Sequence, residues 1–169
     1  MIVNRIIFIF DMSGSMHPNR ENMIEKYNDF LIKQKKENGD KLLLTIFFNN
    51  NVQICNNILI KDAKLLTDND YIPFGTTRLY DAIGKSFEMC QRDKNNICVI
   101  LTDGQENCSE KWTQHQIFNK IIYLKEKKDW VFYFYGCDPN TYEIGFKMGI
   151  YNTHRVKPLS MNLKKVYED

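Results

Sequence analysis

Apolar stretches alternate with amphipathic stretches along the chain, and the alternation predicts strands and helices in turn. Two runs, residues 5–11 and 97–103, are almost continuously apolar, as is typical of strands buried on both faces of a parallel sheet. Residues 41–49 predict a further strand. The segment Val52–Ile60 follows that strand too closely for a helical crossover. We therefore expect it to pair antiparallel with residues 41–49.

Helical spacing of apolar residues separates these strands. Residues 20–38 show this spacing, and Gly39 should end that helix. A second helix is predicted along Leu79–Cys90. A third should begin at a capping box formed by Thr113 and Gln116.

The C-terminal part adds shorter elements. Trp130–Tyr135 predicts a strand. Asp138 as N-cap and Pro139 at the first helical position predict a short helix, which Gly149 stops. A short strand near Thr153–Val156 and a helix from about Ser160 should complete the fold.

This order of elements predicts an α/β fold in a single domain covering residues 1–169. We expect a doubly wound, mostly parallel, Rossmann-like sheet of about six strands, with one antiparallel edge strand and helices on both faces. In such sheets, ligands bind outside the carboxyl ends of the strands, where the strand order reverses.

Composition narrows the class of function. The chain has 169 residues, 43% of them apolar, and a net charge of +2 from 23 basic and 21 acidic residues. So balanced a charge argues against a nucleic-acid surface. No stretch is long enough to span a membrane, and the apolar run Ile6–Phe10 is shorter than the core of a signal peptide. We therefore expect a cytoplasmic protein.

The cysteines support that interpretation. Their number is odd and their spacing lacks a CxxC pair, so neither a disulfide framework nor a zinc site is indicated. We expect reduced thiols, most of them in the core, at Cys55, Cys90, Cys98, Cys108 and Cys137.

Polar residues follow the two most apolar strands. The first strand leads into Asp11, Ser13 and Ser15, and the second leads into Thr102-Asp103-Gly104. Carboxylate and hydroxyl oxygens are ligands for a hard cation such as Mg²⁺. Because both strands should end at the same edge of the sheet, the sequence predicts a metal site there.

The chain resembles a von Willebrand factor type A domain with a metal-ion-dependent adhesion site. Asp11-Met12-Ser13-Gly14-Ser15 matches the family's Asp-x-Ser-x-Ser motif, and Asp103 matches its distant aspartate. Gly75-Thr76-Thr77-Arg78-Leu79 is similar to the family's Gly-x-Thr-x-Leu segment, an alignment that selects Thr77 rather than Thr76. The run Trp130–Gly136 is similar to small stand-alone members found in bacteria and viruses.

The resemblance implies a metal-dependent protein-binding module that is not an enzyme. It implies Mg²⁺, with Mn²⁺ and Ca²⁺ as alternatives, and a partner protein that presents an Asp or Glu to the ion. It also implies direct coordination by the serines and the threonine, with one or both aspartates acting through water. The ligands carried over from the family are Asp11, Ser13, Ser15, Thr77 and Asp103.

Several nearby residues have alternative roles. Thr77 is also a candidate N-cap for the helix that follows it. Asp81 should lie in the first turn of that helix, where an acid interacts favourably with the helix dipole, so we interpret it as structural. For Trp112 we expect packing, with an exposed interface role as the alternative. Candidates for a rim that contacts the partner are Met16, His17, Arg78, Gln105 and Glu106. Of these, Arg78 would attract a partner carboxylate and Glu106 would repel one.

The sequence leaves two other functions open. An aspartate at the end of the first strand, beside Mg²⁺, is also similar to haloacid-dehalogenase-like phosphatases, in which Asp11 would be the nucleophile. Ser13 then stands where those enzymes have a second aspartate, and a serine does not act as a general acid at neutral pH. The third hypothesis is a structural scaffold that binds no metal, against which the complete five-residue set argues.

Overall fold

The computed structural model describes residues 4–38, 40–103 and 106–155. Within them, the strands form one six-stranded sheet in the order β3-β2-β1-β4-β5-β6, parallel throughout except for β3 at one edge. The strands are β1 (Arg5–Asp11), β2 (Leu42–Phe48), β3 (Val52–Leu59), β4 (Asn96–Thr102), β5 (Val131–Gly136) and β6 (Thr153–Arg155). The predicted sheet, including its antiparallel edge strand, is confirmed.

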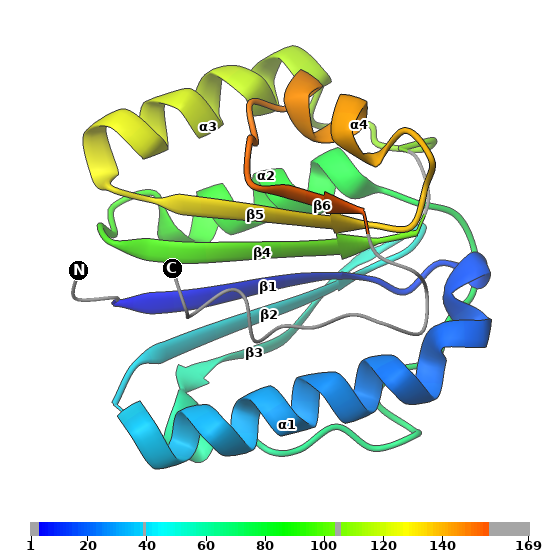
Figure 1. Cartoon of the computed structure of the whole chain (residues 1–169), viewed down its shortest axis with the longest axis vertical. Helices are drawn as coiled ribbons and strands as arrows, with labels where there is room; N and C mark the ends of the chain where they lie inside the picture. Colours follow the sequence, from blue (N-terminus) through cyan, green and yellow to red (C-terminus); the bar gives the residue numbers. More distant parts are fainter. Residues whose placement is uncertain (1–3, 39, 104–105, 156–169) are drawn as a thin grey trace.

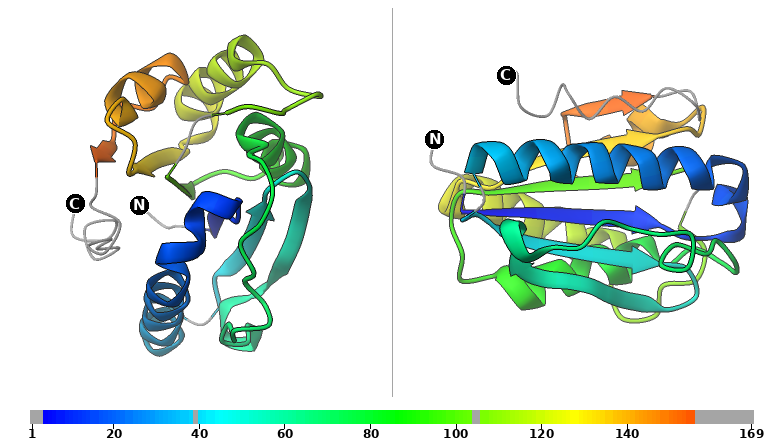
Figure 2. Two further views of the ribbon diagram at one scale, coloured as in Figure 1. Left: turned by 90° about the vertical axis from the view of Figure 1, so that its right-hand side faces the viewer. Right: turned by 90° about the horizontal axis from the view of Figure 1, so that it is seen from below.

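Helices cover both faces of the sheet, as predicted. In Figures 1 and 2, α1 lies on one face, and α2, α3 and α4 lie on the other. The α-helices of the described residues are α1 (Arg20–Asn38), α2 (Leu79–Cys90), α3 (Gln114–Lys128) and α4 (Thr141–Lys147). Two short 3₁₀ helices, η1 (Gly14–Asn19) and η2 (Ile60–Asp62), were not predicted.

The alternation of side chains along β1 explains the two cores. Phe8 and Phe10 face α1, where the Phe8 ring meets Phe30 edge to face with 4.6 Å between ring centroids. Ile7 and Ile9 face the opposite way and belong to the cluster that includes α2 and α3. Because every residue of β1 is buried, the strand is fixed from both sides, and the position of its last residue, Asp11, is fixed with it.

Most predicted boundaries hold within a residue or two, and the capping box of Thr113 and Gln116 is present. The predicted start of α4 is wrong. Asn140 is its N-cap, while the carboxylate of Asp138 accepts a hydrogen bond from the backbone N–H of Asn140 at 2.6 Å. Asp138 therefore closes a turn before the helix instead of capping it. After α4, Gly149 has φ of +78°, as a helix stop requires.

Other expectations need correction or fall outside the described residues. Of the cysteines, Cys90 and Cys98 are buried, so the expectation that most lie in the core is wrong. In the part of the chain that the structure describes, no helix is long and apolar enough to cross a membrane. Predictions for Gly39, Gly104, Gln105, Val156 and the helix from about Ser160 fall on residues outside that part.

Candidate metal centre

The candidate centre lies where the strand order reverses. β1 pairs with β2 on one side and with β4 on the other, and all three strands run in the same direction. Asp11 is the last residue of β1, and Asp103 directly follows the last residue of β4. The two acids predicted from sequence are therefore brought to the same edge of the sheet, at the position where open α/β sheets bind ligands.

Hydrogen bonds link four of the five predicted ligands into one network. The backbone N–H of Ser13 donates to Asp11 Oδ1 at 2.7 Å, which closes the turn after β1. The hydroxyls of Ser13 and Ser15 are 3.1 Å apart. Ser15 Oγ then donates to Asp103 Oδ1 at 2.8 Å, across a separation of 88 residues. Asp11, Ser13, Ser15 and Asp103 are thus assembled in one place.

Asp11 is fully buried. Its second oxygen, Oδ2, accepts a hydrogen bond of 2.6 Å from Thr102 Oγ1 at the end of β4. Burial raises the pKa of the Asp11 carboxyl above its ordinary value, and the hydrogen bonds from Ser13 and Thr102 offset only part of that rise. The charge of the nearby Asp103 raises this pKa further. The hydrogen bonds therefore do not fully offset the cost of burying the ionised Asp11 carboxylate.

Asp103 is in a similar position. Loss of hydration raises the pKa of its carboxyl, while the hydrogen bond from Ser15 lowers it. Among the described residues, neither Asp11 nor Asp103 forms an ion pair with a lysine, arginine or histidine. In the part of the chain that the structure describes, two acids therefore lie close together with hydroxyl groups around them and no cationic side chain paired with them.

Thr77 reaches the same region on a different segment. The backbone N–H of Gly14 donates to the carbonyl of Gly75 at 3.1 Å, so residues 75–77 lie against the turn that follows β1. Gly75 has φ of +76°, and a Cβ there would approach Asn50 Oδ1 to 2.1 Å, so this contact requires glycine. The backbone of Thr77 is held by Asn107, whose Oδ1 accepts from the Thr77 N–H at 2.9 Å.

The two candidate threonines have different surroundings. Thr76 is exposed, and its hydroxyl lies 3.0 Å from Cys108 Sγ. Thr77 is 4% exposed, and within the described chain its hydroxyl makes no hydrogen bond. The alternative role of Thr77 as a helix N-cap is wrong, because Arg78 occupies that position. Of the two threonines, Thr77 is therefore the one whose hydroxyl has no partner among the described residues, and it stays the predicted ligand.

The rim predicted from sequence needs several corrections. Met16 is fully buried because η1 turns it inward, so it cannot contact a partner. His17 is exposed, as a rim residue would be. Arg78 is already paired, with Glu110 at 2.8 Å and Asp81 at 3.5 Å. The Arg78 guanidinium is therefore not a ready partner for an incoming carboxylate.

Glu106 holds the loop after β4 onto α2. Its Oε2 accepts from the backbone N–H of Tyr80 at 3.0 Å, and its Oε1 accepts from the N–H of Cys108 at 2.9 Å. Tyr80 is in the first turn of α2, where helix N–H groups lack partners within the helix. Glu106 supplies that partner from a different segment, so it has a structural role in place of the predicted rim role.

Asp81 anchors the same loop from the helix side. Its carboxylate accepts backbone N–H bonds from Glu110, Lys111 and Trp112 at 2.9 to 3.0 Å. The structural interpretation of Asp81 is confirmed. Neither these bonds nor the bond from Tyr80 to Glu106 could be predicted, because they connect positions 26 to 31 residues apart through backbone N–H groups that carry no sequence signal.

Trp112 packs onto α2 through a close approach. Its ring meets Phe87 edge to face with 5.8 Å between centroids. A Cβ on Gly84 would lie 2.2 Å from Trp112 Nε1, so the indole occupies the space that the glycine leaves open. The expected packing role of Trp112 is confirmed. The signal in the sequence was Gly84 itself, a glycine inside a helix.

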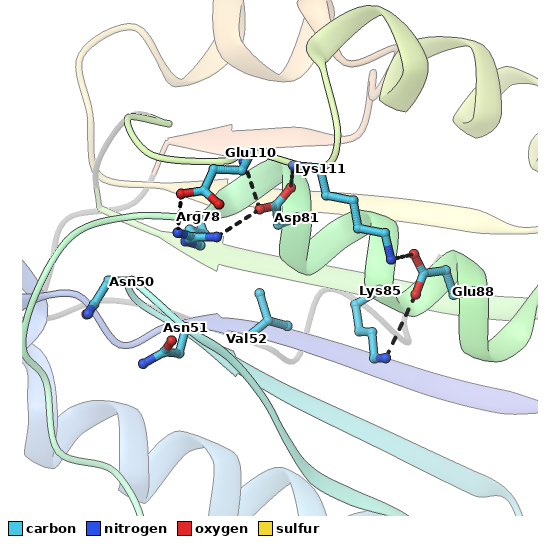
Figure 3. Close-up of a pocket in the computed structure, with 9 residues that line it drawn as sticks. All are labelled: Asn50, Asn51, Val52, Arg78, Asp81, Lys85, Glu88, Glu110 and Lys111. Carbon is cyan, nitrogen blue, oxygen red and sulfur yellow. Dashed lines mark hydrogen bonds and ion pairs between the residues drawn. The ribbon is translucent and has the colours of Figure 1, made fainter.

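Beyond Arg78, a polar pocket of about 330 Å³ lies between the β2–β3 turn and the loop around Glu110. Figure 3 shows its charged side chains joined in pairs, with Lys85 and Lys111 both reaching Glu88. The residues lining it are Asn50, Asn51, Val52, Arg78, Asp81, Lys85, Glu88, Glu110 and Lys111. The pocket therefore adjoins the candidate centre and carries both signs of charge.

The predicted ligands are all oxygen groups. The described residues contain no group of three or more His, Cys, Asp or Glu side chains that could hold an ion. A cation here would instead be held by two carboxylates and neutral hydroxyls. Such a set suits hard ions such as Mg²⁺, Mn²⁺ and Ca²⁺ better than zinc or copper.

Solved structures with a similar arrangement identify the fold. A von Willebrand factor type A protein from Catenulispora acidiphila superimposes with a TM-score of 0.53 and 15% identity over 79% of this chain. The ArnB paralog VWA2 from Sulfolobus acidocaldarius gives 0.54 and 16% over 89%. The chain has a von Willebrand factor type A fold. The manganese-loaded TRAP protein of Plasmodium vivax is also similar, with a TM-score of 0.61 and 16% identity over 87% of the chain.

At 15 to 16% identity, these similarities show the fold and no closer relationship. The chain spans 33%, 39% and 63% of the lengths of the Catenulispora, Sulfolobus and Plasmodium structures, respectively. No protein-family model and no curated protein sequence matches it. Function must therefore be argued from the site itself.

Proposed function

We propose that this protein is a metal-dependent protein-binding module. A divalent cation, Mg²⁺ in the first instance, would be held by Asp11, Ser13, Ser15, Thr77 and Asp103, and an Asp or Glu of a partner protein would complete its coordination. The observation that carries the proposal is the pairing of Asp11 with Asp103 through the two serine hydroxyls, with no cationic side chain beside them in the described part of the chain.

The proposed ligands fit such an ion electrostatically. Two nearby acids, one fully buried and one partly buried, have pKa values raised by lost hydration. A divalent cation would favour the ionised form of both acids, so its binding would recover that lost hydration energy. The similar TRAP structure is described as manganese-loaded, which supports a divalent ion as compatible with this fold.

The same ligand set supports binding to a partner's acid. The three hydroxyls are neutral, so the protein would supply two negative charges at most, and the bound ion would remain a strong Lewis acid. Mg²⁺ keeps water in part of its coordination shell. A carboxylate from another protein could replace such a water, and this is the chemistry that the ion would supply.

A binding role agrees with the surroundings of Ser13 better than a phosphatase role. Ser13 stands where a haloacid-dehalogenase-like enzyme would have its general acid, and its hydroxyl lies against Ser15. A serine at that position cannot protonate a leaving group at neutral pH. We therefore propose a module that binds without catalysis.

Thermal unfolding in the presence of Mg²⁺, Mn²⁺ or Ca²⁺ tests the metal. Binding to the folded state alone stabilises it by about 2.7 kcal/mol at about a hundred times the dissociation constant. Wild type should gain this stability and Asp11→Ala should not. Glu25→Gln removes a charge from an exposed position on α1 and should respond like wild type. Equal shifts for wild type and Asp11→Ala would contradict the proposed site.

A second experiment tests the acidic partner. Wild type in Mg²⁺ should bind a random peptide library with a fixed central Asp more tightly than the same library with Asn at that position. Chelation with EDTA should abolish the difference. Equal binding of the two libraries would contradict the proposed mode of recognition, even if the metal binds.

A further inference from the structure

An extended segment beside the candidate centre presents two apolar side chains to solvent. Exposure alternates from residue 71 to 74, with Tyr71 and Pro73 buried and Ile72 and Phe74 exposed by 54% and 48%. Successive side chains of an extended chain point to opposite sides, so Ile72 and Phe74 share the outward side. Single exposed apolar residues are ordinary, but an adjacent pair beside a candidate site indicates a contact surface. We call Ile72 and Phe74 the apolar rim.

The backbone beneath the apolar rim is held firmly against the candidate centre. The hydroxyl of Tyr71 donates to the carbonyl of Asp11, and Arg20 Nε donates to the carbonyl of Tyr71 at 2.9 Å. The backbone N–H of Phe74 donates to the carbonyl of Met12 at 3.0 Å. The rim is therefore attached to the same turn that carries the proposed ligands, and a partner would lose little entropy in ordering it.

The charged pocket gives no comparable preference. The charged pocket in Figure 3 carries three cations and three anions, and ion pairs link them. They are Arg78, Lys85, Lys111, Asp81, Glu88 and Glu110. Paired charges of both signs attract neither an acidic nor a basic segment strongly. The apolar rim therefore offers the clearer basis for discrimination among acidic partners.

We infer that the partner is a protein segment in which a bulky apolar side chain lies close in sequence to the acid that reaches the metal. The acid would bind at the ion while the apolar side chain covers Ile72 and Phe74. This inference rests on the proposed function, and it adds a chemical description of the partner. The metal-bound acid supplies the dependence on Mg²⁺, and the rim contact selects one acidic segment over another.

Selection from the peptide library with a fixed central Asp tests the inference. In Mg²⁺, wild type should enrich peptides with Phe, Leu, Ile, Met or Trp near the Asp by roughly tenfold over peptides with polar neighbours, because burying such a side chain favours binding by about that factor. The library with Asn in place of Asp should show no Mg²⁺-dependent enrichment of any kind.

A double variant of the rim separates this inference from the proposed function. Ile72→Ser with Phe74→Ser changes only exposed side chains, so the thermal shift with Mg²⁺ should be unchanged while the apolar preference is lost. The matched control replaces Tyr142 and Phe146 by Ser, since these are exposed by 51% and 53% on α4. The control should keep the wild-type preference.

The outcomes distinguish the two ideas. If Asp-containing peptides are enriched in Mg²⁺ without any apolar preference, or if the rim variant keeps that preference, the rim inference is wrong and the proposed function stands. If no Mg²⁺-dependent enrichment of Asp over Asn occurs, the acid-binding function fails and the inference fails with it.

Discussion

Two pairs of acids near the carboxyl end of the sheet are held in different ways. Asp81 accepts backbone N–H bonds from the loop after β4, and Glu106 accepts them from α2 and from its own loop. Asp11 and Asp103 are held mainly by hydroxyls and lie close enough to raise the pKa of Asp11. The first pair uses its charge inside the protein, where it fixes a loop. The negative charge of Asp11 and Asp103 is not neutralised by any cationic side chain among the described residues. Their pairing therefore indicates a place for a cation.

Removing the charge of Asp81 should have the largest effect on stability. In Asp81→Asn, an amide NH₂ group replaces an oxygen that accepts backbone N–H bonds from the loop, so at least one part-buried donor loses its partner and faces an NH₂ group instead. We expect a loss of about 3 kcal/mol in the free energy of unfolding. Urea unfolding measures it. The loss in unfolding free energy should be the same with Mg²⁺ and with EDTA. A loss that depended on Mg²⁺ would contradict the distinction between Asp81 and Glu106 on one side and Asp11 and Asp103 on the other.

The equivalent change at Asp11 should act in the opposite direction. Asp11→Asn keeps an oxygen for the Ser13 N–H and places its NH₂ group against Thr102 Oγ1, which can accept. It removes an ionised group whose burial is unfavourable, so the metal-free protein should gain on the order of 1 kcal/mol. The variant should also lose the stabilisation of about 2.7 kcal/mol that wild type gains at about a hundred times the dissociation constant of Mg²⁺. A metal-free variant less stable than wild type would contradict this account.

The raised pKa of Asp11 predicts how stability depends on pH. Its ordinary value is near 3.8, and the folded-state pKa lies above it, so the folded protein binds this proton more tightly than the unfolded chain. In EDTA, this contribution to stability is full below pH 3.8, is lost as pH rises through the folded-state pKa, and stays absent above it. Asp11→Asn should lack this loss. The difference in unfolding free energy between wild type and variant, measured across the acid range, tests the sign.

Ser15→Ala should have the smallest effect on the protein itself. Ser15 is exposed and its hydroxyl bridges Ser13 and Asp103, so metal-free stability should change by about 0.5 kcal/mol or less. As a proposed ligand and a positioning group for Asp103, it should matter more for the ion, and we expect Mg²⁺ affinity to fall at least about tenfold. Titration followed by thermal shift measures both. Unchanged affinity would remove Ser15 from the ligand set.

Sequence reasoning succeeded where local pattern dictates structure. The apolar run of residues 5–11 and the helical spacing of residues 20–38 predicted β1 and α1 closely. A strand buried on both faces is apolar throughout, and a helix buried on one face repeats its apolar residues at helical spacing. It also placed Asp11 and Asp103 at one edge, since parallel strands end together. These are consequences of the fold class that need no knowledge of side-chain contacts.

It failed where distant segments decide the outcome. Met16 was expected on the rim, but η1 turns it into the core. Glu106 was expected to face a partner, but its carboxylate accepts the backbone N–H of Tyr80, 26 residues away on α2. The outward side of Ile72 and Phe74 was missed for the same reason. It depends on Tyr71 being anchored at Asp11, 60 residues away.

Direct counting of bound Mn²⁺ tests the central claim most closely. The free ion gives an electron paramagnetic resonance signal that falls as protein binds it. Wild type and Asp81→Asn should each bind one ion per chain, competed away by Mg²⁺, whereas Asp11→Asn and Asp103→Asn should bind none at the same concentrations. Equal binding by wild type and Asp11→Asn, or no binding by any of the four, would contradict the account of Asp11 and Asp103 as the acids that hold a cation.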